Sequence, residues 1–212
     1  ANTAGPRRPL SFYLHLPFCP SLCHYCGCHV IVTRKQGKML RYGDLIDEEI
    51  RLVARALPDR RRVGQLHLGG GTPNAMPTKS LWRTLQTLRS HFELDDGAEL
   101  AIEVDPRRVV PLQLGALVAM GFNRVSLGVQ DVDLGVQAAI GRHQTLEEST
   151  RAVTLARAAG FQAVNIDLVY GLPGQTTASI ESTVASIVAS RVDRVALFGF
   201  AFLPEARPNQ RK

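Results

Sequence analysis

The sequence has few aromatic residues, only 6% of its 212, and no long uninterrupted apolar run. A membrane-spanning helix needs ~20 consecutive apolar residues, so we expect no membrane span. The arginines near the start have no apolar segment behind them, so the sequence predicts no signal peptide. Scarce aromatic side chains leave little material for stacking on bases, and no nucleic-acid-binding motif is present. We therefore expect no nucleic-acid partner.

Cysteine is missing from the chain outside one short segment, which holds all four: Cys19, Cys23, Cys26 and Cys28. Pairs this close in sequence would close only very small loops, so a disulfide framework explains them poorly. The lack of secretory features also favours a reducing compartment, and we expect a cytoplasmic protein. The cysteines therefore indicate metal binding.

The spacing of the thiols, Cys-x3-Cys-x2-Cys, bears on which metal they bind. Structural zinc sites usually add a second Cys/His pair a dozen or more residues later, and none follows here. His24 and His29 could complete a zinc site, so zinc stays an alternative. One tight loop of thiolates is typical of an iron–sulfur cluster. Three ligands would leave one iron of a four-iron cluster open for chemistry.

Charge and composition set further bounds. Apolar residues make up 45% of the chain, enough for a substantial core. The net charge is +6, with basic clusters at Arg7–Arg8, Arg60–Arg62 and Arg107–Arg108. Such clusters could meet an anionic ligand, although solvated faces and loops are the simpler interpretation. No linker or low-complexity segment divides the chain, so we expect one domain over residues 1–212.

The chain alternates between short apolar segments and longer helical ones. The predicted strands are Ser11–Leu16, Gln65–Gly69, Leu100–Asp105, Arg124–Gln130, Ala163–Val169 and Arg194–Phe200. The predicted helices are Tyr42–Leu57, Ser80–Phe92, Leu112–Ala119, Leu146–Ala159 and Ile180–Ser190, with Gly121 and Gly160 just after two of them. This order predicts an α/β fold with a parallel sheet. A partial or closed barrel and a doubly wound sheet both fit, but the glycine fingerprint and P-loop of nucleotide-binding doubly wound folds are absent.

Candidate binding residues follow the carboxyl ends of these strands, where parallel barrels keep their chemistry. The second strand ends in Gly69-Gly70-Gly71, whose backbone can approach a ligand closely. Glu103, Gln130 and Asp167 occupy equivalent places on three later strands. Each alone could simply end a strand or cap a helix. Carboxylates within apolar strands are costly unless paired or liganded, so together they predict a polar pocket that faces the cysteines.

At this point the sequence resembles a known family. The segments FYLHLPFCPSLCHYCGCHVIVTR, HLGGGTP, AIEVDPR, FNRVSLGVQD and VNIDLVYGLPGQT resemble those of radical S-adenosylmethionine (SAM) enzymes of the oxygen-independent coproporphyrinogen III oxidase family, or coproporphyrinogen dehydrogenases. The resemblance runs from about Leu10 to Lys212. It implies a parallel six-stranded partial (βα)6 TIM-like barrel. The family's N-terminal extension and C-terminal domain are absent, so we expect this chain to be the catalytic barrel portion of a longer protein.

The resemblance also implies cofactors and their ligands. Cys19, Cys23 and Cys26 match the ligands of a [4Fe-4S] cluster, and Cys28 matches a cysteine that does not bind it. The family binds two SAM molecules. Tyr13, Gly70, Glu103 and Ala201 match contacts to the first, and Tyr25, Gly71, Thr72, Gln130, Arg142 and Asp167 match contacts to the second. Phe200 and Phe202 replace a tyrosine and a histidine expected in the family's YAHLP segment, which removes two polar groups.

The activity that the resemblance implies is the oxidative decarboxylation of two propionate side chains of coproporphyrinogen III to vinyl groups. The product is protoporphyrinogen IX, in heme and porphyrin biosynthesis. SAM cleavage by the cluster would supply the radical, and an unidentified electron donor and acceptor would take part. We expect a monomer. The alternative is a related heme chaperone that shares the loop and the barrel but usually lacks a cysteine at the position of Cys28.

Overall fold

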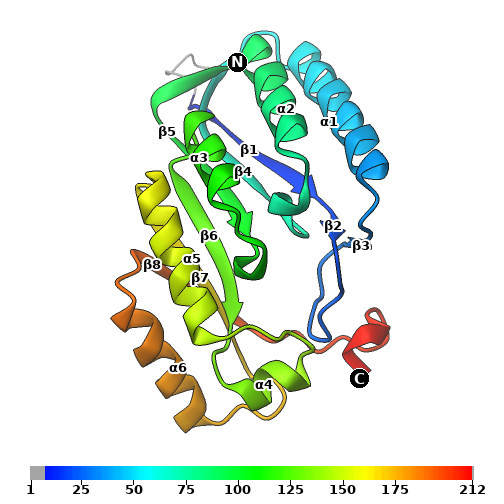
Figure 1. Ribbon diagram of the computed structural model, residues 1–212. Coiled ribbons are helices and arrows are strands. Elements are labelled where there is room, and N and C mark those ends of the chain that lie inside the picture. The colour runs from blue at the N-terminus through cyan, green and yellow to red at the C-terminus, as the bar shows by residue number, and fades with distance from the viewer. Residues whose placement is uncertain (1–7, 212) are drawn as a thin grey trace, which may run out of the picture.

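The computed structural model describes residues 8–211, which form a curled sheet of six parallel strands with helices along one side (Figure 1). Arg7 and Lys212 lie outside the described residues. The strands are β1 (Leu10–Leu16), β4 (Arg62–Gly70), β5 (Glu93–Val104), β6 (Arg124–Gln130), β7 (Ala163–Tyr170) and β8 (Arg194–Gly199). Their order in the sheet follows their order in the chain. A doubly wound sheet would reverse direction at a switch point, so the expected partial barrel is confirmed and the doubly wound alternative is wrong.

Within residues 8–211, six α-helices connect and cover the strands. They are α1 (Gln36–Ala56), α2 (Thr78–His91), α3 (Pro111–Ala119), α4 (Leu134–Ala139), α5 (Leu146–Ala159) and α6 (Thr177–Ala189). All five predicted helices are confirmed, α5 with the expected bounds. The sequence did not predict α4 or the two-stranded sheet β2 (Phe18–Cys19) and β3 (Ile31–Val32), because segments this short show no periodicity. No helix within residues 8–211 is long and apolar enough to cross a membrane.

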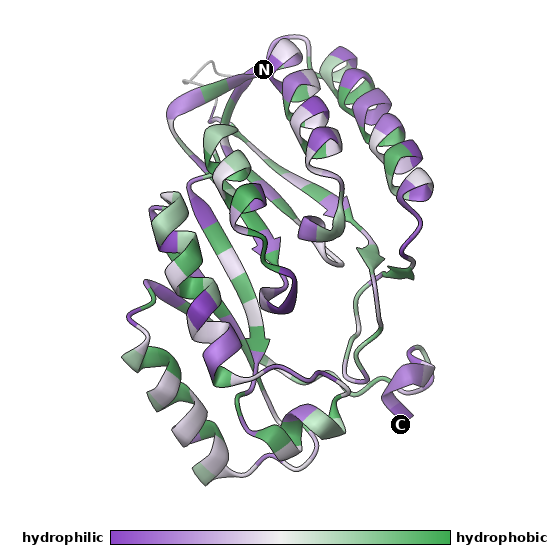
Figure 2. Ribbon diagram, in the orientation of Figure 1, coloured by the Kyte–Doolittle hydropathy of each residue, from purple (hydrophilic) through white to green (hydrophobic). Residues whose placement is uncertain are grey.

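The core lies between the sheet and its covering helices. Val125 and Leu127 on β6 and Val164, Ile166 and Leu168 on β7 are completely buried. Figure 2 shows β6 as largely hydrophobic, whereas α1 and α2 carry hydrophilic residues as well. Parallel strands covered by helices are expected to be apolar in this way. The core therefore fixes the sheet, and polar chemistry is confined to the strand ends and the loops that follow them.

Glycine ends two helices where the sequence places it. Gly121 follows α3 with φ 100°, and Gly160 follows α5 with φ 105°. At the other end of α5, Thr145 and Glu148 form a capping box. A left-handed backbone costs an L-residue about 1–2 kcal/mol, so glycine is the favoured residue at both ends.

We expect Gly160→Ala to lower the free energy of unfolding by about 1–2 kcal/mol, because alanine resists the left-handed backbone. Gly115→Ala is the matched control. Gly115 lies within α3 and has open space around it, so alanine there should raise the free energy of unfolding by about 0.5–1 kcal/mol. Urea denaturation of both variants measures the pair. Equal effects from the two would contradict the helix-end explanation.

Candidate functional site

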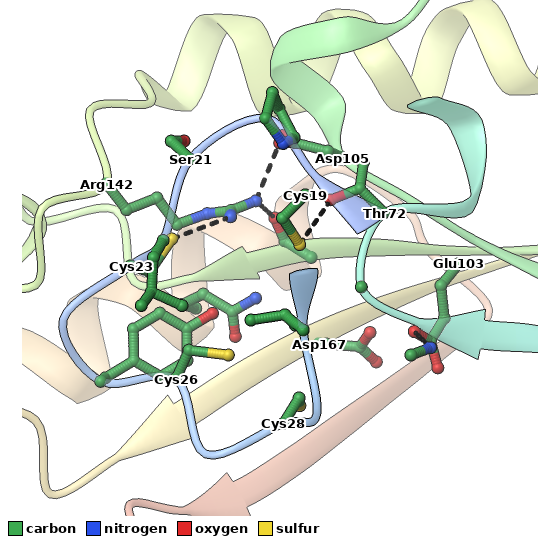
Figure 3. A pocket seen from close by; sticks show the side chains of 18 of the residues that line it. Cys19, Ser21, Cys23, Cys26, Cys28, Thr72, Glu103, Asp105, Arg142 and Asp167 are labelled. Carbon is green, nitrogen blue, oxygen red and sulfur yellow. Dashed lines mark hydrogen bonds and ion pairs between the residues drawn. The ribbon is translucent and has the colours of Figure 1, made fainter. Parts of the chain in front are cut away.

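The carboxyl ends of the strands face a cavity of ≈180 Å³ that the cysteine segment encloses (Figure 3). All the predicted site residues except Tyr13 and Ala201 line it: Cys19, Cys23, Tyr25, Cys26, Gly70, Gly71, Thr72, Glu103, Gln130, Arg142 and Asp167. They come from the cysteine loop, from β4, β5, β6 and β7, and from the loop after α4. The structure therefore brings most of the predicted residues to one place, although they are spread over some 150 residues of sequence.

Tyr13 and Ala201 lie outside this lining. Tyr13 stacks on His67 with ring centroids 5.7 Å apart, and its hydroxyl lies 3.3 Å from Nδ1 of His15. Partial burial and the nearby carboxylate of Glu103, which itself lines the cavity, raise the pKa of Tyr13. Ala201 is exposed, and its carbonyl accepts a hydrogen bond from Nε2 of Gln210 at 3.0 Å.

The cysteine loop connects β2 to β3, and its thiols reach the cavity from different sides (Figure 3). Sγ of Cys19 lies 3.3 Å from Oγ1 of Thr72, and Nη1 of Arg142 donates to Sγ of Cys23 at 3.8 Å. Burial raises the pKa of Cys19, and the Thr72 hydroxyl opposes that shift. Cys28 also lines the cavity, and a hydrogen bond with the Cys26 thiol lowers the pKa of Cys28 to about 7.

The two histidines of the zinc alternative differ, because the His24 ring has a hydrogen-bond partner elsewhere whereas His29 makes its contact through the backbone. Nδ1 of His24 lies 3.2 Å from the carbonyl oxygen of Ala139, and the His29 ring is on an exposed residue whose carbonyl contacts His15. No three Cys, His, Asp or Glu side chains of the described chain converge as ligands of a single ion would. The thiols are instead spread around a cavity, an arrangement that suits a larger metal group.

Packing, as well as a possible ligand, explains why glycines occupy the end of β4 and the position after it. A Cβ at Gly71 would lie 2.7 Å from the backbone of Pro17, and one at Gly70 would lie 2.6 Å from the His15 ring. The backbone amide of Gly71 donates to Leu16 at 2.9 Å. These glycines therefore let the end of β4 approach the start of the cysteine segment.

Positive charge gathers on one side of the cavity. Arg142 is 6% exposed and donates through Nη2 to the Gly128 carbonyl at 2.6 Å and to Asp105 at 3.3 Å, while its buried Nε has no partner. Arg107 pairs with the same carboxylate at 2.7 and 2.9 Å. Burial raises the pKa of Asp105, but Arg107 and Arg142 outweigh it and hold that pKa below its ordinary value. Two guanidinium groups share one carboxylate, so this side can attract an anion.

Negative charge lies on the other side. Glu103 accepts a hydrogen bond from the backbone amide of Gly70 at 3.1 Å and lies 3.0 Å from Nε2 of His67. Asp167 accepts from the Ser126 hydroxyl at 2.9 Å and from Nδ2 of Asn165 at 2.7 Å. Burial raises the pKa of Asp167, and Glu103 adds to the shift. The cavity can therefore hold a ligand that carries separated charges of both signs.

The raised pKa of Asp167 predicts the effect of Asp167→Asn on stability. A carboxyl whose pKa is raised by folding favours the native state at low pH and loses that advantage as pH rises through the folded pKa. Removing the ionisable group should therefore raise the free energy of unfolding near neutral pH, and the difference should shrink below about pH 4. Urea titrations of both proteins at neutral and acidic pH measure this. A stability loss that grows with pH would contradict the assignment.

Three further positions from the sequence analysis, Gln130, Phe200 and Phe202, differ in their surroundings. Gln130 lines the cavity with φ 74°, a left-handed backbone that is uncommon outside glycine. Phe200 packs against a small apolar cluster that includes Val169, whereas Phe202 is 60% exposed. The two phenylalanine rings lie 5.9 Å apart, so this edge of the site is apolar.

Residues Arg207, Asn209 and Gln210 were missed by the sequence analysis. They belong to the segment PNQRK and its neighbour, in which no motif was recognised, yet their side chains contact the cysteine loop. Their only sequence signal is a pair of amide side chains, which carries no information about a partner far along the chain.

Comparison with known proteins identifies the family. Residues 13–187 match the radical SAM superfamily. The chain is 43% identical over 206 residues to the oxygen-independent coproporphyrinogen III oxidase of Pseudomonas aeruginosa, covering 96% of this chain and 45% of that protein. It is 45% identical over 208 residues to the enzyme of the same name from Escherichia coli K12, covering 98% of this chain and 45% of the relative.

The solved structure of the Escherichia coli coproporphyrinogen III oxidase HemN superposes with a TM-score of 0.91 at 43% identity, over 98% of this chain and 48% of that one. This chain thus spans a little under half the length of these relatives. Their names do not favour the heme-chaperone alternative. The match covers the cysteine loop, the six-stranded half-barrel and the cavity between them, and the chain belongs to the radical SAM superfamily.

Proposed function

We propose that residues 1–212 are the catalytic barrel of an oxygen-independent coproporphyrinogen III oxidase, an oxidoreductase of porphyrin biosynthesis. The observation that carries the proposal is the near-complete coverage of this chain by enzymes of that name at more than 40% identity. The substrate is coproporphyrinogen III, whose two propionate side chains become vinyl groups. The cysteine usage supports a cytoplasmic location, and we propose a monomer with an external electron donor and acceptor.

Three thiols are proposed to hold the [4Fe-4S] cluster: those of Cys19, Cys23 and Cys26. They fit the group because they line one cavity from separate positions, and thiolates are its usual ligands. When bound, the cluster supplies the electron that cleaves SAM and so starts radical chemistry. The chain's own task is to present the thiols, hold SAM and exclude water from the reaction.

Two SAM molecules are proposed to occupy the site. Tyr13, Gly70, Glu103 and Ala201 would contact the first, and Tyr25, Gly71, Thr72, Gln130, Arg142 and Asp167 the second. The separation of charge across the cavity supports this, because the methionine part of SAM carries a carboxylate and an ammonium group. The Arg142 side suits the carboxylate. The Glu103 side suits the ammonium or a ribose hydroxyl, since a carboxylate accepts two hydrogen bonds.

The test uses the full-length protein, reconstituted anaerobically with iron and sulfide and supplied with a reductant, a one-electron acceptor, SAM and coproporphyrinogen III. Protoporphyrinogen IX and carbon dioxide should form, in a ratio of one porphyrin to two molecules of gas. A heme titration runs in parallel. Tight heme binding without any product would overturn the proposal in favour of the chaperone function.

A further inference from the structure

The cysteine loop has little internal structure of its own. Between β2 and β3, the only backbone hydrogen bond within residues 20–30 of the described chain joins Cys26 to the Cys23 carbonyl at 3.2 Å. The loop is fastened on one side to the end of α4, where the backbone amide of His24 donates to Ile140 at 2.8 Å. A backbone with so few internal bonds can adopt many conformations, so its thiols need an external support to stay in place.

That support comes from the turn at Pro208–Arg211, which lies beside the loop at the other end of the chain (Figure 1). Nδ2 of Asn209 contacts the carbonyl oxygens of Cys23, His24 and Cys26 at 3.2, 3.0 and 3.0 Å. Nε2 of Gln210 donates to Tyr25 at 2.8 Å and Nε of Arg207 donates to Gly27 at 2.8 Å. Every carbonyl from Cys23 to Gly27 thus accepts a hydrogen bond from Arg207, Asn209 or Gln210, and we call these three side chains the amide clamp.

Asn209 is the member of the amide clamp whose side-chain contacts all go to the loop. Gln210 also donates to Ala201 and accepts from the amide of Leu203, so it stabilises its own turn as well. The carbonyls held by Asn209 belong to Cys23, His24 and Cys26. A carbonyl lies in the peptide plane that follows its residue, so Asn209 holds the plane after Cys23 and the plane after Cys26, and this restricts the direction of each Cα–Cβ bond.

We propose that Asn209 is a positioning residue that sets the conformation of the cysteine loop and so presents Cys23 and Cys26 to the metal group. The inference rests on the proposed cluster site but concerns the loop itself, which exists before any cluster binds. Asn209 touches neither thiol; it acts through the backbone that carries them. Loss of the Asn209 amide donor would leave the carbonyls of Cys23, His24 and Cys26 without this partner and would loosen the cysteine loop between them.

Two variants of the full-length protein test the role, Asn209→Ala and Asn209→Asp. Aspartate has nearly the size of asparagine but cannot donate when ionised, and its charge repels the carbonyls. The matched control is Arg211→Ala, in the same turn, because Arg211 pairs only with the exposed Glu205 at 2.8 Å among the side chains described. All three should keep the parent's thermal unfolding midpoint within a few degrees, as expected for exposed or half-buried positions.

The first readout uses cluster-free protein. Hydrogen exchange at the backbone amides of His24 and Cys26, which are bonded within the loop or to α4, should speed up about tenfold in both Asn209 variants, a factor equivalent to ~1.4 kcal/mol. Arg211→Ala should leave it unchanged. The second readout uses reconstituted protein. The reduced-cluster electron paramagnetic resonance spectrum should broaden, and loss of iron to a chelator should be about tenfold faster in the Asn209 variants.

The two proposals fail in different ways. A parent that never binds a cluster would overturn the proposed function, whatever the exchange rates show. A parent that binds a cluster, together with Asn209 variants that match it in exchange, spectrum and iron loss, would overturn the role of Asn209. Altered exchange with an equal shift in Arg211→Ala would show a general loosening of the turn and would also overturn it.

Discussion

Cys19→Ala, Cys23→Ala and Cys26→Ala should each abolish the brown, oxygen-sensitive cluster after anaerobic reconstitution of the full-length protein. The three thiols line one cavity, and no cysteine outside the loop could replace a lost ligand. Loss of one of the three thiolates would leave the proposed cluster with an incomplete set of ligands. Iron and sulfide analysis, with visible absorbance, measures the outcome.

Cys28→Ala is the matched control for these three variants. Cys28 lines the same cavity and is exposed, but the family resemblance leaves it outside the proposed ligand set. Most of the cluster absorbance should therefore remain, while product formation is expected to fall. If Cys28→Ala loses the cluster as fully as Cys26→Ala, the ligand assignment is wrong.

Arg142→Ala should weaken the binding of the second SAM molecule by about 1.5–3 kcal/mol, or roughly ten- to a hundredfold, because a charge-assisted contact is lost. The fold should survive, since Arg107 still pairs with Asp105 at 2.7 and 2.9 Å and compensates its charge. The first SAM molecule, on the Tyr13 and Glu103 side, should be affected much less. Equilibrium titration of the reconstituted full-length enzyme should show two sites in the parent and one in the variant at moderate SAM concentration.

Arg62→Ala serves as the control for that titration, because Arg62 pairs with Asp95 on the surface at 2.9 Å and does not line the cavity. It should bind two molecules as the parent does. A parent that binds only one SAM per chain would refute the two-molecule proposal and would favour the heme-chaperone alternative.

The sheet could be predicted closely because each strand is a short apolar run between amphipathic segments. The run around Leu127 on β6 and the one around Ile166 on β7 are buried in the structure as expected. Periodicity also placed α5, which has a capping box and a terminal glycine in addition to its apolar face. These signals are local, so the sequence carries them without a partner.

The site could be predicted only in part, because its geometry depends on residues that are distant in sequence. The ends of the predicted strands identified Glu103 and Asp167 as site residues. No local sequence pattern indicated that Arg142 would share Asp105 with Arg107. Asn209 gave no signal at all, since an amide in a polar segment is ordinary. Its contacts arise only when the half-barrel brings the segment after β8 beside the cysteine loop.

The amide clamp also has a consequence for protein synthesis, because the cysteine loop and the residues that hold it are translated at different times. Cys23 and Asn209 lie 186 residues apart, and a ribosome adding ~5–20 residues per second needs roughly 10–40 s to pass from one to the other. During that interval the thiols of the nascent chain have been synthesised but the donor that fixes their loop has not. The cysteine loop is thus translated early, but its conformation is fixed only after Asn209 has been added. On the proposed role of Asn209, a cell that makes this protein has to keep those thiols reduced over the interval, and stable loading with iron would follow the synthesis of β8 and the turn after it.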